Sequence, residues 1–154
     1  IRDTELRQRQ SAEKKTDPAT GRRCKESDDP YGQMIDQIVI AVSDLAVSRE
    51  FYAQVLAPLQ YQVVSQDAEG CGFSIMQRPD FWIRQGGPVA PPVRIAFTCR
   101  DRASVDGFYA AATSAGADSQ AQPDVREESH GNSYAATILD PDGNTIEAVC
   151  HRPQ

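Results

Sequence analysis

The feature that most constrains the fold of this chain is an internal repeat with a spacing of 57 residues. The dipeptide Phe51-Tyr52 recurs as Phe108-Tyr109 (108 − 51 = 57). In each copy an apolar strand is followed by apolar residues at helical spacing, and then by three short strand-like runs separated by turn residues. Such a repeat indicates two copies of one βαβββ unit. We therefore expect an α+β fold made of two tandem modules.

The two modules can be bounded from the same pattern. Module one is expected over residues 34–86 and module two over residues 92–152. In module one the pattern predicts a strand at 37–42, a helix from Leu45 that stops before Pro58, and strands at 61–66, 71–77 and 80–85. In module two it predicts a strand at 93–99, a helix from about 103 to 115 that ends at Gly116, and strands at 119–127, 134–139 and 145–150.

Residues 1–33 differ in composition from the modules. They contain all of the lysines and half of the 16 basic residues, but almost no branched apolar residues. Such a segment buries too little surface to offset its chain entropy. We expect a disordered or foreign leader.

Charge and hydropathy exclude several classes of partner. A net charge of −6 argues against the electropositive surface that binds a phosphate backbone, so no nucleic-acid partner is expected. The chain has no apolar run long enough to span a bilayer and no signal-peptide pattern, and its four cysteines form no CxxC pair. We expect no membrane association, a cytoplasmic location and reduced thiols without a catalytic role.

The alternation of apolar residues assigns each strand two faces. Ile95 and Phe97 should pack under the helix of module two, which leaves Arg94 on the opposite face of the sheet. The same alternation places Glu147 and Trp82 on the faces that point away from the helices. If one curved mixed sheet encloses a central cleft, these residues and Gln37 would line it.

The motifs resemble those of the vicinal oxygen chelate superfamily, which includes glyoxalase I, extradiol dioxygenases and the fosfomycin and bleomycin resistance proteins. The resemblance rests on the openings VSDLAVSREFY and IAFTCRDRASVDGFYAAA, on FWI, and on the closing LDPDGNTIEAV. It covers residues 34–152 and implies paired βαβββ modules around a cleft. It also implies a homodimer, which is common in the family.

The resemblance places a divalent metal ion on four equivalent strand positions, which correspond here to Gln37, Trp82, Arg94 and Glu147. Only Glu147 is a ligand of the expected kind. Tryptophan offers no ligand atom, and arginine is a permanent cation that repels a metal ion. One carboxylate and one amide do not supply the three or four ligands that zinc, nickel or iron need. We therefore predict no metal site and no cofactor.

The same residues allow several readings. Glu147 is either a catalytic base or a carboxylate paired with Arg94 across adjacent strands. Arg94 can also serve as a fixed positive charge that holds an anionic ligand. Trp82 either stacks on a flat ligand or fills the space of the lost ion. His130 lies in a polar loop and Tyr134 follows it, so both are candidates for the rim of the cleft.

The predicted function is that of a glyoxalase/bleomycin-resistance-like protein that binds a small anionic or aromatic molecule and has a degraded metal site. Two alternatives stay open. One is a lyase or isomerase of the glyoxalase type that uses Glu147 as its base, and the other is a structural or regulatory module with a closed cleft. The sequence does not decide whether the chain is an enzyme.

Overall fold

The computed structural model describes residues 35–126 and 133–152. The leader expected over residues 1–33 lies outside the described residues. Module one consists of β1 (Ile38–Val42), α2 (Leu45–Val55), the short 3₁₀ helix η2 (Ala57–Leu59), β2 (Gln62–Gln66), β3 (Gly70–Ser74) and β4 (Phe81–Gln85). Module two consists of β5 (Arg94–Thr98), α3 (Arg102–Ser114), β6 (Ser119–Arg126), β7 (Ser133–Leu139) and β8 (Thr145–Cys150).

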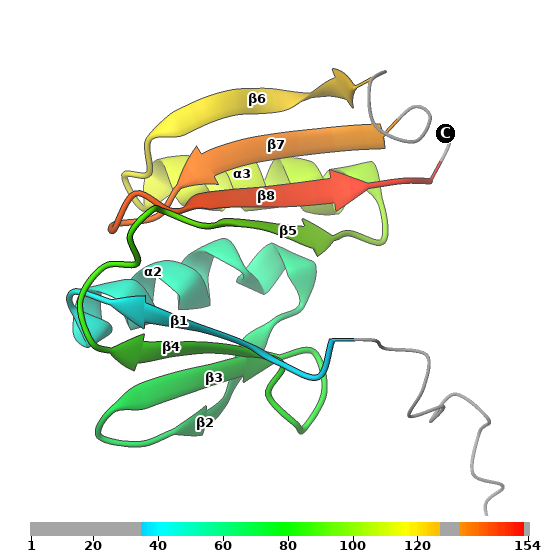
Figure 1. The fold of residues 1–154 in the computed structure, drawn as a ribbon. Helices are drawn as coiled ribbons and strands as arrows, with labels where there is room; N and C mark the ends of the chain where they lie inside the picture. The colour runs from blue at the N-terminus through cyan, green and yellow to red at the C-terminus, as the bar shows by residue number, and fades with distance from the viewer. Residues whose placement is uncertain (1–34, 127–132, 153–154) are drawn as a thin grey trace, which may run out of the picture. The chain divides into compact units, whose positions relative to one another are not determined.

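Each module forms its own four-stranded mixed sheet, as Figure 1 shows. The strand orders are β1-β4-β3-β2 and β5-β8-β7-β6, with the first pair in each sheet parallel and the other pairs antiparallel. The predicted α+β fold of two tandem βαβββ modules is confirmed, with the strands divided between two sheets.

The two helices begin in the same way, 57 residues apart. The Asp44 carboxylate accepts hydrogen bonds from the backbone N–H groups of Ala46 and Val47 at 2.9 and 3.0 Å. The Asp101 carboxylate accepts from the backbone N–H of Ser104 at 2.8 Å. Each aspartate thereby satisfies N–H groups that the helix itself leaves without a partner, so each fixes where its helix starts.

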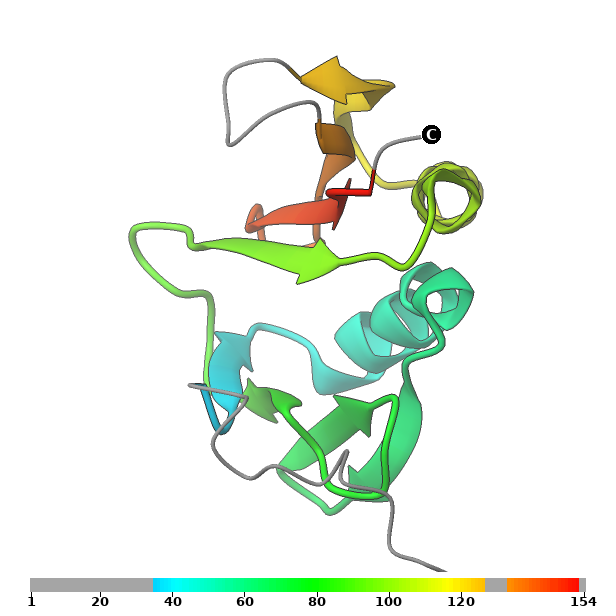
Figure 2. The same ribbon diagram turned by 90° about the vertical axis from the view of Figure 1, so that its right-hand side faces the viewer.

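The helices lie on one side of the sheets, as the turned view in Figure 2 shows, and the apolar residues of the strands point toward them. Ile95 and Phe97 are buried, whereas Arg94, Ala96 and Thr98 are exposed, so the predicted alternation is confirmed for β5. We call the opposite side of each sheet the open face. In module one it carries Val39, Gly70, Gly72, Trp82 and Arg84, and in module two it carries Arg94, Ala96, Thr98, Thr137 and Glu147.

Aromatic contacts join the cores of the two modules. The ring of Phe97 on β5 meets the rings of Phe81 on β4 and Tyr61 before β2 edge to face, with centroids 5.3 Å apart in both pairs. Helices α2 and α3 also contact each other. Because the apolar sides of both sheets are used in this shared core, only the open faces are left for binding between strands.

Candidate functional site

The strand register shows which positions of the two open faces are equivalent. On module one Val39 lies beside Trp82, and on module two Ala96 lies beside Glu147. Val39 and Ala96 are 57 residues apart (96 − 39 = 57) and both occupy the first strand of their module. Trp82 therefore stands in module one where Glu147 stands in module two.

Glu147 is held by two arginines. Arg94, which precedes Ala96 on the neighbouring strand β5, donates a hydrogen bond to Glu147 Oε2. Arg126 on β6 reaches the same oxygen at 3.8 Å and donates a 2.7 Å hydrogen bond to the hydroxyl of Thr137. The ion pair that the sequence predicted between Arg94 and Glu147 is present, and Arg126 is a second cation that sequence reasoning missed.

Burial of these three charged side chains is unequal. The Glu147 side chain is 10 % exposed and that of Arg126 is 29 % exposed, whereas that of Arg94 is 61 % exposed. Two guanidinium groups facing one carboxylate leave one positive charge in excess. The buried carboxylate therefore anchors an arginine whose outer N–H groups remain available to an anion on the open face.

Trp82 lies on the open face of module one beside two glycines. A Cβ atom built on Gly72, which pairs with Trp82, would come within 2.9 Å of the indole and 2.7 Å of Pro79. A Cβ atom on Gly70, which pairs with Arg84, would come within 3.0 Å of the Arg84 side chain. The absence of side chains at these alternate positions of β3 leaves the space in which Trp82 and Arg84 lie against the sheet.

The arginine and the tryptophan of this platform also contact each other. The Arg84 guanidinium carbon lies 5.1 Å from the centre of the Trp82 ring, within the range of a cation–π interaction. Trp82 is partly exposed. The open face of module one therefore offers an aromatic surface with a cation beside it.

The remaining predicted residues do not join this group in the described structure. Gln37 is exposed just before β1. Tyr134 pairs with Cys150 and faces α3, where its hydroxyl donates a 2.8 Å hydrogen bond to Asp106. The placement of Tyr134 at the rim is therefore corrected: it lies an odd number of residues from Thr137, so its side chain points to the other side of β7. His130 lies outside the described residues.

Trp82 and the pair of Arg94 and Glu147 belong to different sheets, and no contact among the described residues joins them. The single cleft lined by all four predicted positions stays a prediction. The residues at these positions do not fit a metal ion, for the chemical reasons given by their side chains. In the part of the chain that the structure describes, no cluster of three or more His, Cys, Asp or Glu side chains could hold one.

Comparisons with known proteins agree with this architecture. The family described as the Glyoxalase/Bleomycin resistance protein/Dioxygenase superfamily matches residues 34–148. The fold and the open faces define a protein of the vicinal oxygen chelate type, and the chain belongs to this superfamily. No curated protein matches it in sequence.

Solved structures resemble the chain in fold. A glyoxalase/bleomycin resistance protein from Albidiferax ferrireducens T118 is 24% identical, with a TM-score of 0.69 over 77% of this chain and 100% of that chain. The lactoylglutathione lyase of Agrobacterium tumefaciens is 18% identical, with a TM-score of 0.58 over 76% of this chain and 92% of that one. The fosfomycin resistance protein FosX of Mesorhizobium loti is 20% identical, with a TM-score of 0.58 over 75% and 90%. At these identities the likeness extends to the fold and not to an activity.

The described helices also bear on membrane association. None of them combines the length with the apolar character that a helix needs to cross a bilayer.

Proposed function

We propose that this protein binds a small anionic molecule on the open face of module two and that it does so without a metal ion. The observation that carries the proposal is the guanidinium of Arg94, which is 61 % exposed while its partner Glu147 is buried. A guanidinium fixed in this way presents a preorganised fork of donors to a carboxylate or phosphonate.

The aromatic platform of module one supports the second half of the ligand description. The indole of Trp82 is partly exposed, and the Arg84 guanidinium lies beside it. A flat ligand stacks on such a surface. We therefore propose an anion with an aromatic part as the preferred ligand class, and benzoate as the simplest probe of it.

The contacts of Glu147 count against its use as a base. Both arginines meet the same oxygen, Oε2, so a proton could reach that atom only if Arg94 moved away. We propose a binding role for this pair and derive no proton transfer from it. A partner copy of the chain covering the open faces, as a homodimer would, is compatible with the exposed side chain of Val39.

Isothermal titration of benzoate and of neutral benzamide into the wild type and into Arg94→Ala tests the proposal. Loss of the charge-assisted hydrogen bond should weaken benzoate binding by about tenfold or more and should leave benzamide unaffected. Arg78→Ala is the matched control, because Arg78 is exposed, pairs only with Asp36 at 2.7 Å, and carries the same charge.

The same variants separate the alternative functions. A wild type that binds no anion, with Arg94→Ala changing only the stability, would support a closed structural module. Turnover of an α-hydroxy thioester or a hemithioacetal that disappears in Glu147→Gln, with binding retained, would support the lyase or isomerase reading.

A further inference from the structure

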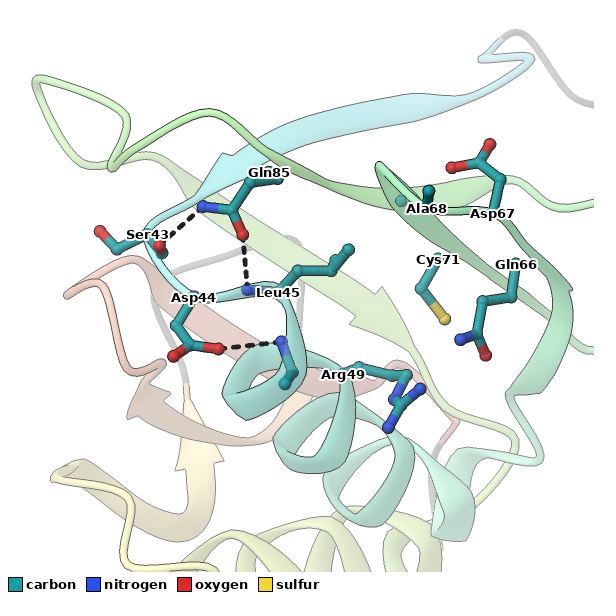
Figure 3. A pocket seen from close by; sticks show the side chains of 11 residues that line it. Ser43, Asp44, Leu45, Arg49, Gln66, Asp67, Ala68, Cys71 and Gln85 are labelled. Atoms are coloured by element: carbon teal, nitrogen blue, oxygen red, sulfur yellow. Dashed lines mark hydrogen bonds between the residues drawn. The ribbon is translucent and has the colours of Figure 1, made fainter.

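A cavity of about 630 Å³ lies in module one, on the side of the sheet opposite to the open face. Its walls are the first turns of α2, the β2–β3 hairpin and the end of β4, as Figure 3 shows. Cys71 and Gln85 line it, and these residues alternate with Gly72 and Arg84, which belong to the open face. The sheet itself therefore separates this cavity from the proposed anion site.

Module two fills the equivalent space with side chains. There the guanidinium of Arg102 lies 5.0 Å from the centre of the Tyr134 ring, and the Tyr134 hydroxyl donates to Asp106. The residues that correspond to Arg102 and Asp106 in module one are Leu45 (102 − 45 = 57) and Arg49 (106 − 49 = 57).

Tyr134 also has a counterpart in module one. Gly72 pairs with Trp82 as Thr137 pairs with Glu147 (137 − 72 = 65), so Tyr134 corresponds to Glu69, which is exposed (134 − 69 = 65). Module one has no ring at this position, and the hairpin contributes the small side chains of Ala68 and Cys71 to the cavity wall. The cavity results from a difference between two copies of one unit and not from the fold itself.

The start of α2 does not supply the binding groups. The N–H of Leu45 donates to the side-chain amide oxygen of Gln85 at 3.0 Å, and the next two N–H groups donate to Asp44. The other half of the Gln85 amide donates to the carbonyl of Ser43 at 2.8 Å. These groups form a finished wall, so the recognition groups must come from other side chains.

Arg49 is the main candidate among those side chains. Its guanidinium has no hydrogen-bond or ion-pair partner among the residues that the structure describes. Figure 3 shows it near the thiol of Cys71 and the amide of Gln66. Burial raises the pKa of the Cys71 thiol, and the positive charge of Arg49 opposes that effect, as expected for a cation close to the thiol.

The other charges of the lining are negative. The carboxylates of Asp44 and Asp67 lie at the margins of the cavity. One unpaired cation and two carboxylates oppose a dianion, because its second negative charge would face an aspartate. They also oppose a simple cation, because it would face Arg49. A ligand with one negative and one positive group satisfies both sets of charges.

We propose that this cavity binds an aliphatic amino acid. Its carboxylate would contact Arg49 and Gln66, its ammonium group would face the aspartates, and its side chain would lie against Leu45 and Ala68. The volume is within the range of about 300–1,000 Å³ that is typical of small-molecule sites. This site is independent of the proposed function, because it uses none of the residues of the open face.

The test is a titration of ¹⁵N-labelled protein with L-leucine, followed by amide chemical shifts. Two half-ligands are the controls: 4-methylpentanoate lacks the ammonium group and isopentylamine lacks the carboxylate. Leucine should give saturable shifts at Gly70 and Cys71, and each half-ligand should bind about tenfold more weakly or worse. Absence of saturable leucine binding, or shifts confined to the open face around Ala96, would overturn the proposal.

Two variants test the site in different ways. Arg49→Met removes the guanidinium from an exposed helix position, and Ala68→Phe fills the cavity from an exposed turn without changing a charge. Both should weaken leucine binding by about tenfold. Glu50→Gln, on the same helix but outside the lining, should bind as the wild type does. Equal leucine affinity in Arg49→Met and the wild type would contradict the proposal.

A further variant keeps the two sites distinguishable. Arg94→Gln should retain full leucine binding while it loses benzoate binding. If Arg94→Gln loses leucine binding as well, leucine occupies the open face and the cavity is not its site. If benzoate fails to bind the wild type while leucine shifts Gly70 and Cys71, the proposed function is wrong and the cavity proposal stands.

Discussion

The hydroxyl of Tyr52 donates a 2.6 Å hydrogen bond to the carboxylate of Asp140, which lies 88 residues later in the chain. Tyr52 is on α2 of module one, and Asp140 opens the Asp-Pro-Asp-Gly-Asn turn of module two. Both side chains are buried. Asp140 also accepts hydrogen bonds from the backbone N–H and the side-chain amide of Asn144, at 2.7 and 2.9 Å. One carboxylate therefore fixes the turn and ties it to the other module.

Replacing Tyr52 by phenylalanine should destabilise the protein by about 1–3 kcal/mol, because a buried acceptor loses its donor. Urea unfolding monitored by circular dichroism measures the difference. Tyr109→Phe is the matched control from the internal repeat, since the Tyr109 hydroxyl meets only the exposed Ser119 hydroxyl, at 2.9 Å. The control should change stability by about 0.5 kcal/mol or less. Equal losses in the two variants would show that the bond to Asp140 has no special role.

Gly72→Ala should displace Trp82 from the sheet. The added methyl group would lie 2.9 Å from the indole and 2.7 Å from Pro79, closer than a carbon atom tolerates. Trp82 is the only tryptophan of the chain, so its emission maximum reports the change directly and should shift to longer wavelength.

Gly86→Ala is the control for this substitution, because its new Cβ would meet Ala41 at 3.4 Å and only at that distance. Its emission spectrum should match that of the wild type. An unchanged spectrum in Gly72→Ala would mean that Gly72 is not what seats the indole.

Stability should fall in alkaline solution. Burial, with Asp80 as a smaller cause, raises the pKa of Tyr61 from its usual value of 10.0 to about 12. The folded state therefore holds this proton more tightly than the unfolded state does. Its contribution to stability is complete below about pH 10 and is lost as the pH rises toward 12.

Urea midpoints measured from neutral pH to about pH 12 test this dependence. Tyr61→Phe should lower the stability at neutral pH and should flatten its decline above about pH 10. Part of the decline should remain, because burial also raises the pKa of Tyr52 and of Cys99. A Tyr61→Phe curve parallel to that of the wild type would contradict the assignment.

The sequence predicted the fold well because its signals were local and duplicated. Alternation in β5 placed Phe97 inside and Arg94 outside without knowledge of any neighbour, and the repeat supplied each boundary twice. The pairing of Arg94 with Glu147 also followed, because both residues occupy known faces of neighbouring strands.

The rest of the site depends on contacts that alternation does not determine. Arg126 escaped notice because β6 pairs with β7 through two register shifts, which break the period of two on which face assignment depends. Gly70 and Gly72 looked like turn residues, whereas their role is to leave space for side chains of β4. Tyr134 was placed at the rim from its position after a loop, and only the register revealed that it faces α3.

The most direct test of the central claim is a calorimetric titration of benzoate into protein treated with a chelator, repeated after addition of zinc or nickel. If Arg94 supplies the positive charge that binds the anion, benzoate should bind the chelator-treated protein with the same affinity as it binds the metal-supplemented protein. Binding that appears only after a metal ion is restored would contradict the account, and would show that the anion is held by a metal site rather than by Arg94.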